Sequence, residues 1–147
     1  MKLTQLAYVA AIADHGSLRA AARHLGVAQP AITRSLRELE RELGVPLFER
    51  QAKGMVLTPL GEVFLRRARA AQSELQRAQD ELEQYQGEAS GQLRVCLSTA
   101  SHIALLPTTL APFRKRYPKV KLDIIESLFS TTEAALKDGT IDCYIGP

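Results

Sequence analysis

Residues 17–37 constrain the fold of this chain more strongly than any other segment. Small and apolar residues recur there at helical spacing on both sides of Gly26, a residue type that enters a left-handed turn at little cost. Ser17 stands where a helix N-cap is expected, and Pro30 suits the first turn of a following helix. The segment therefore predicts a short alanine-rich helix, a tight turn and a second helix, which together form a helix-turn-helix.

The second of these helices is predicted to have one apolar and one polar face. Its inward residues are Ile32, Leu36, Leu39 and Leu43. Its outward residues all carry hydrogen-bonding side chains, and they are Gln29, Thr33, Arg34, Arg37 and Arg41. Arginine and glutamine can bind guanine and adenine in a bidentate manner, and helix N-termini favour phosphate. The pattern favours a helix that enters a DNA major groove, and the alternative is a solvated polar face on a helical bundle.

Positive charge is concentrated in the first part of the chain. The net charge is +3 overall, and residues 1–58 hold eight Lys or Arg against five Asp or Glu. Residues 59–91 hold four basic against six acidic residues. This distribution makes the N-terminal third the part best suited to a polyanionic partner, although so small an excess is also compatible with ordinary surface charge.

The segments that flank the motif complete a small domain. A first helix is predicted from the spacing of Leu3, Leu6, Val9, Ala10 and Ala13. Two short extended runs on either side of a glycine-containing turn, within residues 47–58, predict a hairpin. Such a hairpin would form a wing whose Arg50 and Lys53 meet the DNA backbone or minor groove; ordinary surface charge is the alternative for these two residues.

A long amphipathic helix is predicted next. Thr58 and Pro59 form a cap followed by a first turn, and no helix breaker occurs between residues 62 and 86. Apolar residues alternate by four and three along it, and they are Phe64, Ala68, Ala71, Leu75, Ala78, Leu82 and Tyr85. Because a narrow seam with polar flanks is poorly buried alone, we expect these residues to pair with a second copy of the chain. Packing against the rest of its own chain is the alternative.

The remaining residues alternate between strand and helix patterns after a polar, glycine-containing hinge. Strands are predicted over 93–97, 120–125 and 141–145, with helices over 103–117 and 132–137, which indicates a parallel α/β sheet. Ligands of such sheets bind beyond the carboxyl ends of the strands. The candidate ligand contacts at these ends are Ser98, Thr99, Ser101, Phe129 and Ser130. The alternative is that these residues act as ordinary helix caps.

Several segments resemble the LysR-type transcriptional regulators. They read GSLRAAA at 16–22, LGVAQPAIT at 25–33, LE at 39–40, LGVPLFER at 43–50 and LTPLG at 57–61. The later part resembles the start of the family's effector-binding domain at LLP (105–107), FRKRYP (113–118) and DGTID (138–142). The resemblance implies a mainly α winged helix-turn-helix at 1–58, a linker and dimerisation helix at 59–87 and a hinge at 88–91. It also implies an incomplete, apparently truncated, periplasmic-binding-protein-like α/β effector domain at 92–147.

The resemblance also implies a function and partners. It implies a sequence-specific transcriptional regulator that binds double-stranded DNA at an interrupted palindrome, forms homodimers or tetramers, responds to a small-molecule effector and contacts RNA polymerase. The expected DNA contacts are Ser17, Arg19, Gln29, Pro30, Ala31, Thr33, Arg34, Arg37, Arg50 and Lys53. The chain departs from the family at Ala28, where a serine is usual. The loss of that cap should cost about 1 kcal/mol of helix stability.

Other classes of protein have little support in the sequence. Cys96 and Cys143 fall in predicted strands as buried thiols, and the three histidines lack the spacing of a zinc site. We expect no cofactor, no metal and no catalytic residue, and His102 beside Ser101 is weak evidence for catalysis. The chain has no apolar run of about 18 residues and no secretion signal at its start, so a cytoplasmic location is expected. The alternative reading is a ligand-binding or hydrolytic α/β protein whose helical head only mediates assembly.

Overall fold

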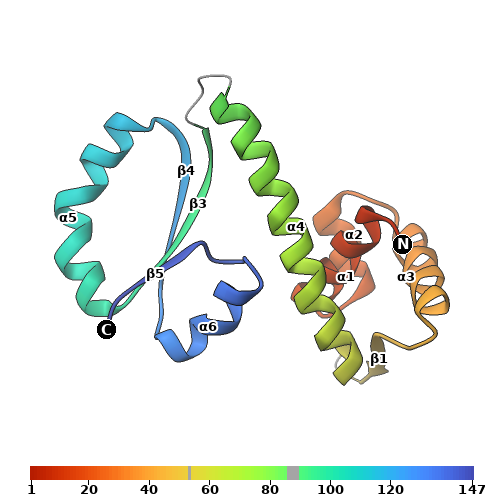
Figure 1. Ribbon diagram of the computed structural model, residues 1–147. Coiled ribbons are helices and arrows are strands. Elements are labelled where there is room, and N and C mark those ends of the chain that lie inside the picture. Colours follow the sequence, from red (N-terminus) through yellow and green to blue (C-terminus); the bar gives the residue numbers. More distant parts are fainter. Residues whose placement is uncertain (53, 86–89) are drawn as a thin grey trace. The chain divides into compact units, whose positions relative to one another are not determined.

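The computed structural model describes residues 1–52, 54–85 and 90–147 of this chain. The chain divides into two compact units, residues 1–72 and 73–147, and one long helix contributes to both (Figure 1). Lys53, a predicted DNA contact, lies outside the described residues. So do residues 86–89, which hold the end of the predicted linker helix and the start of the predicted hinge.

The first unit is the predicted helical head with a wing. It contains α1 (Leu3–His15), α2 (Leu18–Leu25), α3 (Gln29–Leu43), β1 (Phe48–Gln51), β2 (Gly54–Leu57) and the start of α4 (Pro59–Tyr85). Gly16 and Gly26 end α1 and α2 in the left-handed conformation, each with a φ of 66°. The Ser17 hydroxyl accepts a hydrogen bond from the Ala20 amide at 3.1 Å and so caps α2. The predicted turn and caps are confirmed.

The three helices of the head share one core, and its membership differs from the prediction at the helix ends. Val9, Ile12, Ile32 and Leu39 are almost completely buried in it. Leu3 and Leu43 were expected to face inward, but they are 58% and 37% exposed. Leu3 is the first residue of α1 and Leu43 the last of α3, so neither has a helical turn beyond it to complete its packing.

Gln5 is a buried polar residue that the apolar pattern could not identify. Its side-chain Oε1 accepts from the Lys2 amide at 2.7 Å, and its Nε2 donates to the Ser35 carbonyl at 3.4 Å. The first contact caps α1 and the second joins α1 to α3, so both ends of the amide are satisfied inside the head.

The loop between α3 and the wing is held by one carboxylate. Oε1 of Glu40, on α3, accepts hydrogen bonds from the backbone amides of Leu47 at 2.7 Å and Phe48 at 3.2 Å. On the other side of the hairpin, Thr58 donates its hydroxyl to the Pro46 carbonyl at 2.8 Å and accepts the Gly61 amide at 2.9 Å. These bonds fix where the wing leaves α3 and where α4 begins.

Two glycines allow backbones to approach closely around the wing. The Met55 amide donates to the Gly16 carbonyl at 2.8 Å, which joins the wing to the turn before α2. A Cβ at Gly54 would lie 2.3 Å from that carbonyl oxygen, and a Cβ at Gly61 would lie 2.0 Å from the Leu47 carbonyl oxygen. Because no larger side chain fits either contact without a backbone shift, the wing position depends on both glycines.

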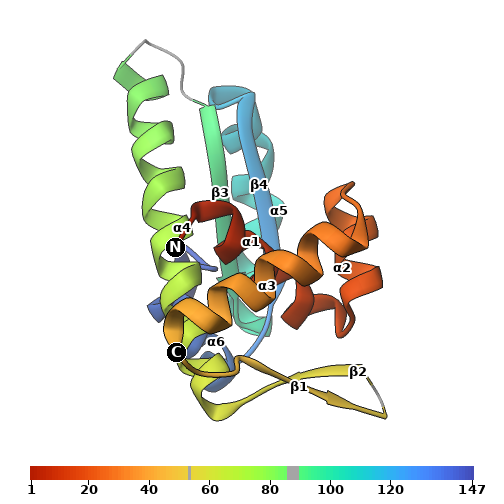
Figure 2. The same cartoon turned by 90° about the vertical axis from the view of Figure 1, so that its right-hand side faces the viewer.

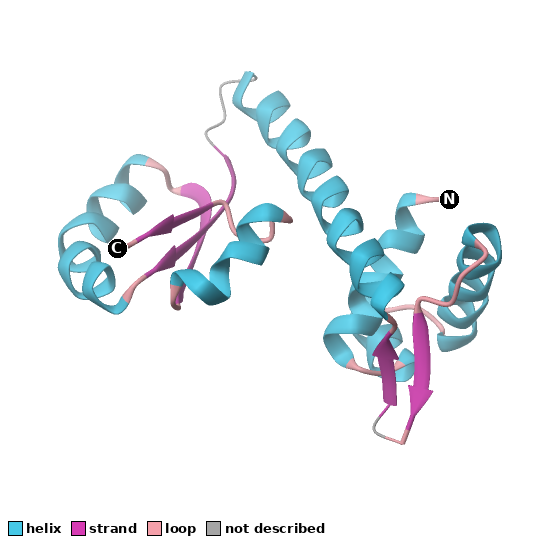
Figure 3. Ribbon diagram, turned by 60° about the horizontal axis from the view of Figure 1, so that its bottom comes forward, coloured by secondary structure: helices cyan, strands magenta, loops and turns pink. Residues whose placement is uncertain are grey.

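The second unit is a parallel α/β sheet, as predicted. Its strands β3 (Ser90–Leu97), β4 (Lys119–Glu126) and β5 (Cys143–Ile145) lie in the order β4-β3-β5 (Figure 3). Its helices are α5 (Thr99–Arg116) and α6 (Phe129–Lys137). Leu93 and Val95 line a cavity with α5 residues, whereas Cys96 contacts Thr132 of α6, so the two helices cover opposite faces of the sheet.

The boundaries in this unit differ from the sequence prediction by a few residues. The helix predicted from residue 103 begins at Thr99, because Ser98 caps it by accepting the Ser101 amide. The helix predicted from residue 132 begins at Phe129, and the last strand is confined to Cys143–Ile145. No residue of α5, all of which is described, is fully buried, so this helix covers its sheet face less completely than α1 and α3 cover each other.

We expect Glu40→Ala to lower the free energy of unfolding of the head by about 2 kcal/mol, because two backbone amides lose a charged acceptor. Glu40→Gln should lose less, since its side-chain carbonyl can still accept. Urea unfolding measures both changes. Glu49→Ala, at an exposed wing position, should have little effect, and equal stability of the Glu40→Ala variant and the wild type would contradict this role.

Candidate nucleic-acid interface

The outward face of α3 gathers most of the predicted base-reading residues. Figure 2 shows α3 crossing the near side of the head, with no other element of the first unit in front of it. One shallow hollow on it is lined by Gln29, Pro30, Thr33, Arg34, Arg37, Glu38 and Arg41. Ala31 is exposed beside the hollow without lining it. The residues expected to contact bases therefore lie side by side on one surface.

A second hollow joins this face to the wing and to the start of α2. Its lining residues come from α2, α3, both strands of the wing and the turn before α2, and they are Ser17, Leu18, Arg19, Gln29, Arg50, Gly54 and Met55. Gln29 belongs to both hollows. The predicted contacts Ser17, Arg19 and Arg50 are thus brought together with the N-terminal end of α3, an arrangement that suits a phosphate backbone crossing between helix and wing.

Two pairs of side chains on the α3 face interact one helical turn apart. The Thr33 hydroxyl donates to the Gln29 carbonyl at 3.0 Å, and the Gln29 Nε2 lies 3.5 Å from that hydroxyl. The Arg34 Nε donates to the Glu38 Oε1 at 3.0 Å. Sequence reasoning missed Glu38, although an acid four residues after an arginine on a helix is a recognisable signal.

The start of α3 has no side-chain cap. Its N-cap residue is Ala28, whose backbone is extended at φ −70° and ψ 133° and whose methyl group accepts no hydrogen bond. A serine at this position would have the backbone geometry that an N-cap requires. The predicted loss of the side-chain cap is confirmed. Pro30 has no amide proton, and the Ala31 amide donates to the Ala28 carbonyl at 3.0 Å instead of to a side chain.

The predicted effector contacts of the second unit are found at the carboxyl ends of β3 and β4. Most of their hydroxyls have partners inside the protein. The Ser98 hydroxyl accepts the Ser101 amide and donates to the Ser101 hydroxyl at 3.0 Å, and the Thr99 hydroxyl donates to the Glu126 carboxylate at 2.6 Å. Phe129 packs its ring against Tyr144 at 5.3 Å between centroids, and Ser130 is exposed at the start of α6. The same residues therefore act as helix caps and lie at the strand ends, so the two expectations do not exclude each other.

Two family models match the chain, and together they decide its classification. Residues 3–62 match the bacterial regulatory helix-turn-helix protein of the lysR family, and residues 86–147 match the LysR substrate binding domain. The chain belongs to the LysR family.

The curated proteins that the chain resembles include named transcriptional regulators. The chain is 36% identical over 143 residues to the HTH-type transcriptional regulator CbbR of Sinorhizobium medicae, which covers 97% of this chain and 45% of that protein. It is 30% identical to the HTH-type transcriptional regulator TfdT of Cupriavidus pinatubonensis, over 99% of this chain and 64% of that protein. The chain thus spans about half the length of most curated relatives it matches.

Solved LysR structures share the fold. A full-length OxyR from Pseudomonas aeruginosa aligns with a TM-score of 0.70 and 29% identity over 96% of this chain and 48% of that chain. A complex of the CbnR DNA-binding domain with DNA aligns with a TM-score of 0.55 and 41% identity over 58% of this chain and 98% of that chain. The chain therefore has a LysR head followed by part of an effector domain, as the sequence predicted.

The apolar seam of the LysR linker helix is only partly covered. Phe64 packs against the core of the head, and Ala68 is 3% exposed within the single chain. Beyond them Leu75 and Leu82 are 45% and 63% exposed, and Tyr85 is 91% exposed. The later half of the seam is therefore the part that presents apolar surface.

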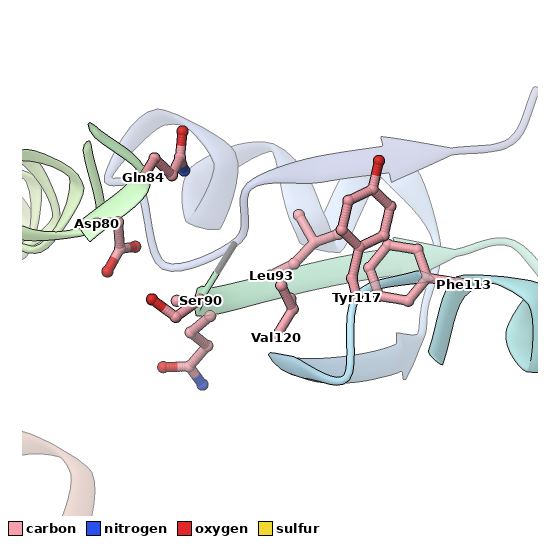
Figure 4. Close-up of a pocket in the computed structure, with 9 residues that line it drawn as sticks. Asp80, Gln84, Ser90, Leu93, Phe113, Tyr117 and Val120 are labelled. Atoms are coloured by element: carbon pink, nitrogen blue, oxygen red, sulfur yellow. The ribbon is translucent and has the colours of Figure 1, made fainter. Parts of the chain in front are cut away.

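A cavity that the sequence did not indicate lies near the C-terminal end of α4 (Figure 4). Its polar residues come from α4 and the start of β3, and its apolar residues come from β3, β4 and the end of α5. They are Asp80, Gln84, Ser90, Gly91, Gln92, Leu93, Phe113, Tyr117 and Val120. We assign this cavity no ligand.

Both cysteines lie in the sheet, as expected. Cys96 is fully buried, with its Sγ 3.3 Å from the Thr132 hydroxyl. Cys143 is partly buried, and burial, followed by the nearby Asp142 carboxylate, raises the pKa of its thiol. A raised pKa lowers the thiolate fraction at neutral pH and makes this cysteine a poorer nucleophile. In the part of the chain that the structure describes, no group of three or more His, Cys, Asp or Glu could hold a metal ion, and no helix is long and apolar enough to cross a membrane.

We expect Ala28→Ser to raise the free energy of unfolding of the head by about 1 kcal/mol, because its hydroxyl can accept the Ala31 amide in the first turn of α3 as a side-chain cap. Thermal and urea unfolding measure the gain. Ala31→Ser adds the same hydroxyl inside the helix, where it cannot cap, so this control should not stabilise the head. A gain no larger than that of the control would contradict the capping argument.

Proposed function

We propose that this chain is the DNA-reading head, linker helix and first part of the effector domain of a transcriptional regulator that acts as a dimer in the cytoplasm. The observation that carries the proposal is the single exposed surface formed by Gln29, Thr33, Arg34 and Arg37 next to the wing. The related DNA-binding domain of CbnR, 41% identical, has been solved in complex with DNA, which supports the same role for this surface.

In the proposed complex α3 enters the major groove. Arg34 and Gln29 have the side chains best suited to guanine and adenine edges, while Ser17, Arg19, Arg50 and Lys53 serve the phosphate backbone or the flanking groove. Pro30, Ala31 and Thr33 complete the surface that faces the bases. Specificity would come from the first group and salt-dependent affinity from the second.

A second copy of the chain is the proposed partner for the linker helix. The exposed apolar residues Leu75, Leu82 and Tyr85 support pairing along the later half of α4. Two heads held by such a pair can meet successive major grooves about 34–36 Å apart, which corresponds to an interrupted palindrome. Further assembly into tetramers and contact with RNA polymerase belong to the same proposal and follow from family membership alone.

Control by a small molecule is proposed for the α/β unit. The carboxyl end of β3 is followed by Ser98, Thr99 and Ser101, and that of β4 by Phe129 and Ser130. Parallel sheets bind ligands at this edge. Ligand binding there would change DNA binding by favouring one arrangement of the two units over another. The proposal includes no catalytic step and no cofactor.

The alternative function is an α/β ligand-binding or hydrolytic protein whose head only mediates assembly. It requires the polar face of α3 to be inert. A substitution on that face separates the two functions.

We expect Arg34→Ala to reduce discrimination between the preferred and a scrambled duplex by about 1–3 kcal/mol, because a bidentate base contact is lost. Gel shifts with a duplex from the gene's own upstream region, over a series of salt concentrations, measure it. Arg114→Ala removes the same charge from the exposed end of α5 and should leave discrimination unchanged. Salt-insensitive binding, or discrimination unchanged by both substitutions, would favour the assembly function.

Leu82→Asp should weaken the dimer, because it places a charge at the apolar part of the seam. Sedimentation velocity over a concentration series measures the monomer–dimer equilibrium. Gln79→Asp introduces the same charge at an exposed polar position of α4 and serves as the control. If both variants sediment as the wild type does, the proposed pairing along this helix is wrong.

A further inference from the structure

One acidic side chain lies among the cations of the α3 face. Glu38 lines the same hollow as Arg34, Arg37 and Arg41. A carboxylate on a surface that faces a polyanion opposes binding by itself, because it repels phosphate. The presence of Glu38 on this surface is explained if its carboxylate makes a contact that a neutral apolar side chain could not make.

Glu38 makes such a contact with Arg34. The Glu38 Oε1 accepts a hydrogen bond from the Arg34 Nε at 3.0 Å, while the Arg34 side chain is 83% exposed. This contact engages one edge of the guanidinium and leaves the two terminal amino groups to donate. Those are the donors that a bidentate contact with guanine O6 and N7 needs.

We propose that Glu38 is a positioning residue for DNA specificity, which holds the Arg34 guanidinium in a guanine-reading orientation before DNA arrives. The proposal rests on the DNA-reading function proposed above and adds a residue to it that makes no base contact. An exposed arginine samples many rotamers, and ordering its side chain on binding costs free energy. An ion pair that already restricts the side chain before binding reduces that cost. The same face shows this arrangement a second time, since Thr33 engages Gln29 one turn earlier.

Positioning and simple charge repulsion predict different effects of removing the carboxylate. If Glu38 only repels DNA, its loss strengthens binding to every sequence equally. If it positions Arg34, its loss also weakens discrimination at the base pair that Arg34 reads, and the effect disappears when Arg34 is absent. The ratio of affinities for matched and mismatched duplexes is therefore the quantity to measure.

The test uses the full chain and a randomised duplex library, from which the wild type selects its preferred sequence. Affinities are then measured for that duplex and for duplexes with single substitutions at the guanine whose recognition Arg34→Ala abolishes. Glu38→Gln should lower the matched-to-mismatched ratio by roughly two- to tenfold, the range expected for ordering one long side chain. In the Arg34→Ala background, Glu38→Gln should leave the ratio unchanged.

The matched control is Glu42→Gln, which removes the same charge one turn further along α3. Glu42 pairs with the N-terminal amine at 2.6 Å rather than with a reader. This variant should shift affinity for all duplexes alike and leave the ratio unchanged. The NMR signal of the Arg34 Nε–H gives a second readout, since it should change on Glu38→Gln and not on Glu42→Gln.

Three results would overturn the inference. The ratio could be the same in Glu38→Gln as in the wild type, it could rise because Glu38 had sequestered Arg34, or it could fall equally in the Arg34→Ala background. A wild-type chain that selects no sequence from the library would overturn the proposed DNA function as well, so the two failures are distinguishable.

Discussion

The backbone contacts made by Glu40 and Thr58 fix the geometry on which the rest of the head depends. Glu40 ties the amides of Leu47 and Phe48 to α3, and Thr58 ties the same loop to the start of α4. Because hydrogen bonds to a charged acceptor are stronger than neutral ones, a single carboxylate can hold an irregular loop in one position. The wing leaves α3 at a defined place only while these bonds persist.

That placement creates a surface shared by elements distant in sequence. Gln29 at the start of α3 lies in one hollow with Arg19 of α2 and Arg50 of the wing. Gly54 lets the wing pack closely against the turn before α2. There the backbone amide of Met55, the next residue, donates to the carbonyl of Gly16. A polyanion crossing this hollow would meet the cations Arg19 and Arg50 beside the amide side chain of Gln29. The packing that places the wing therefore also sets the local charge.

In the second unit, structural hydrogen bonds lie at the edge that we propose binds the effector. Ser98 caps α5 and Thr99 engages Glu126 at the edge where parallel sheets hold ligands. Any ligand at this edge must compete with or extend those hydrogen bonds, and each unsatisfied group would cost free energy.

The sequence by itself determined the helix-turn-helix, the wing hairpin, the long helix α4 and a parallel α/β sheet, because hydrophobic periodicity, glycine turns and caps are local signals. It also predicts Arg34 and Gln29 as base-contacting residues, and its missing cap at Ala28 is confirmed. Tertiary structure alone decided that Leu3 and Leu43 are exposed, that Gln5 is buried and that Glu40 holds the wing loop. Those outcomes depend on which neighbours lie beyond a helix end or across a loop. Such contacts join residues that are distant in sequence, so the periodic pattern of apolar residues does not predict them.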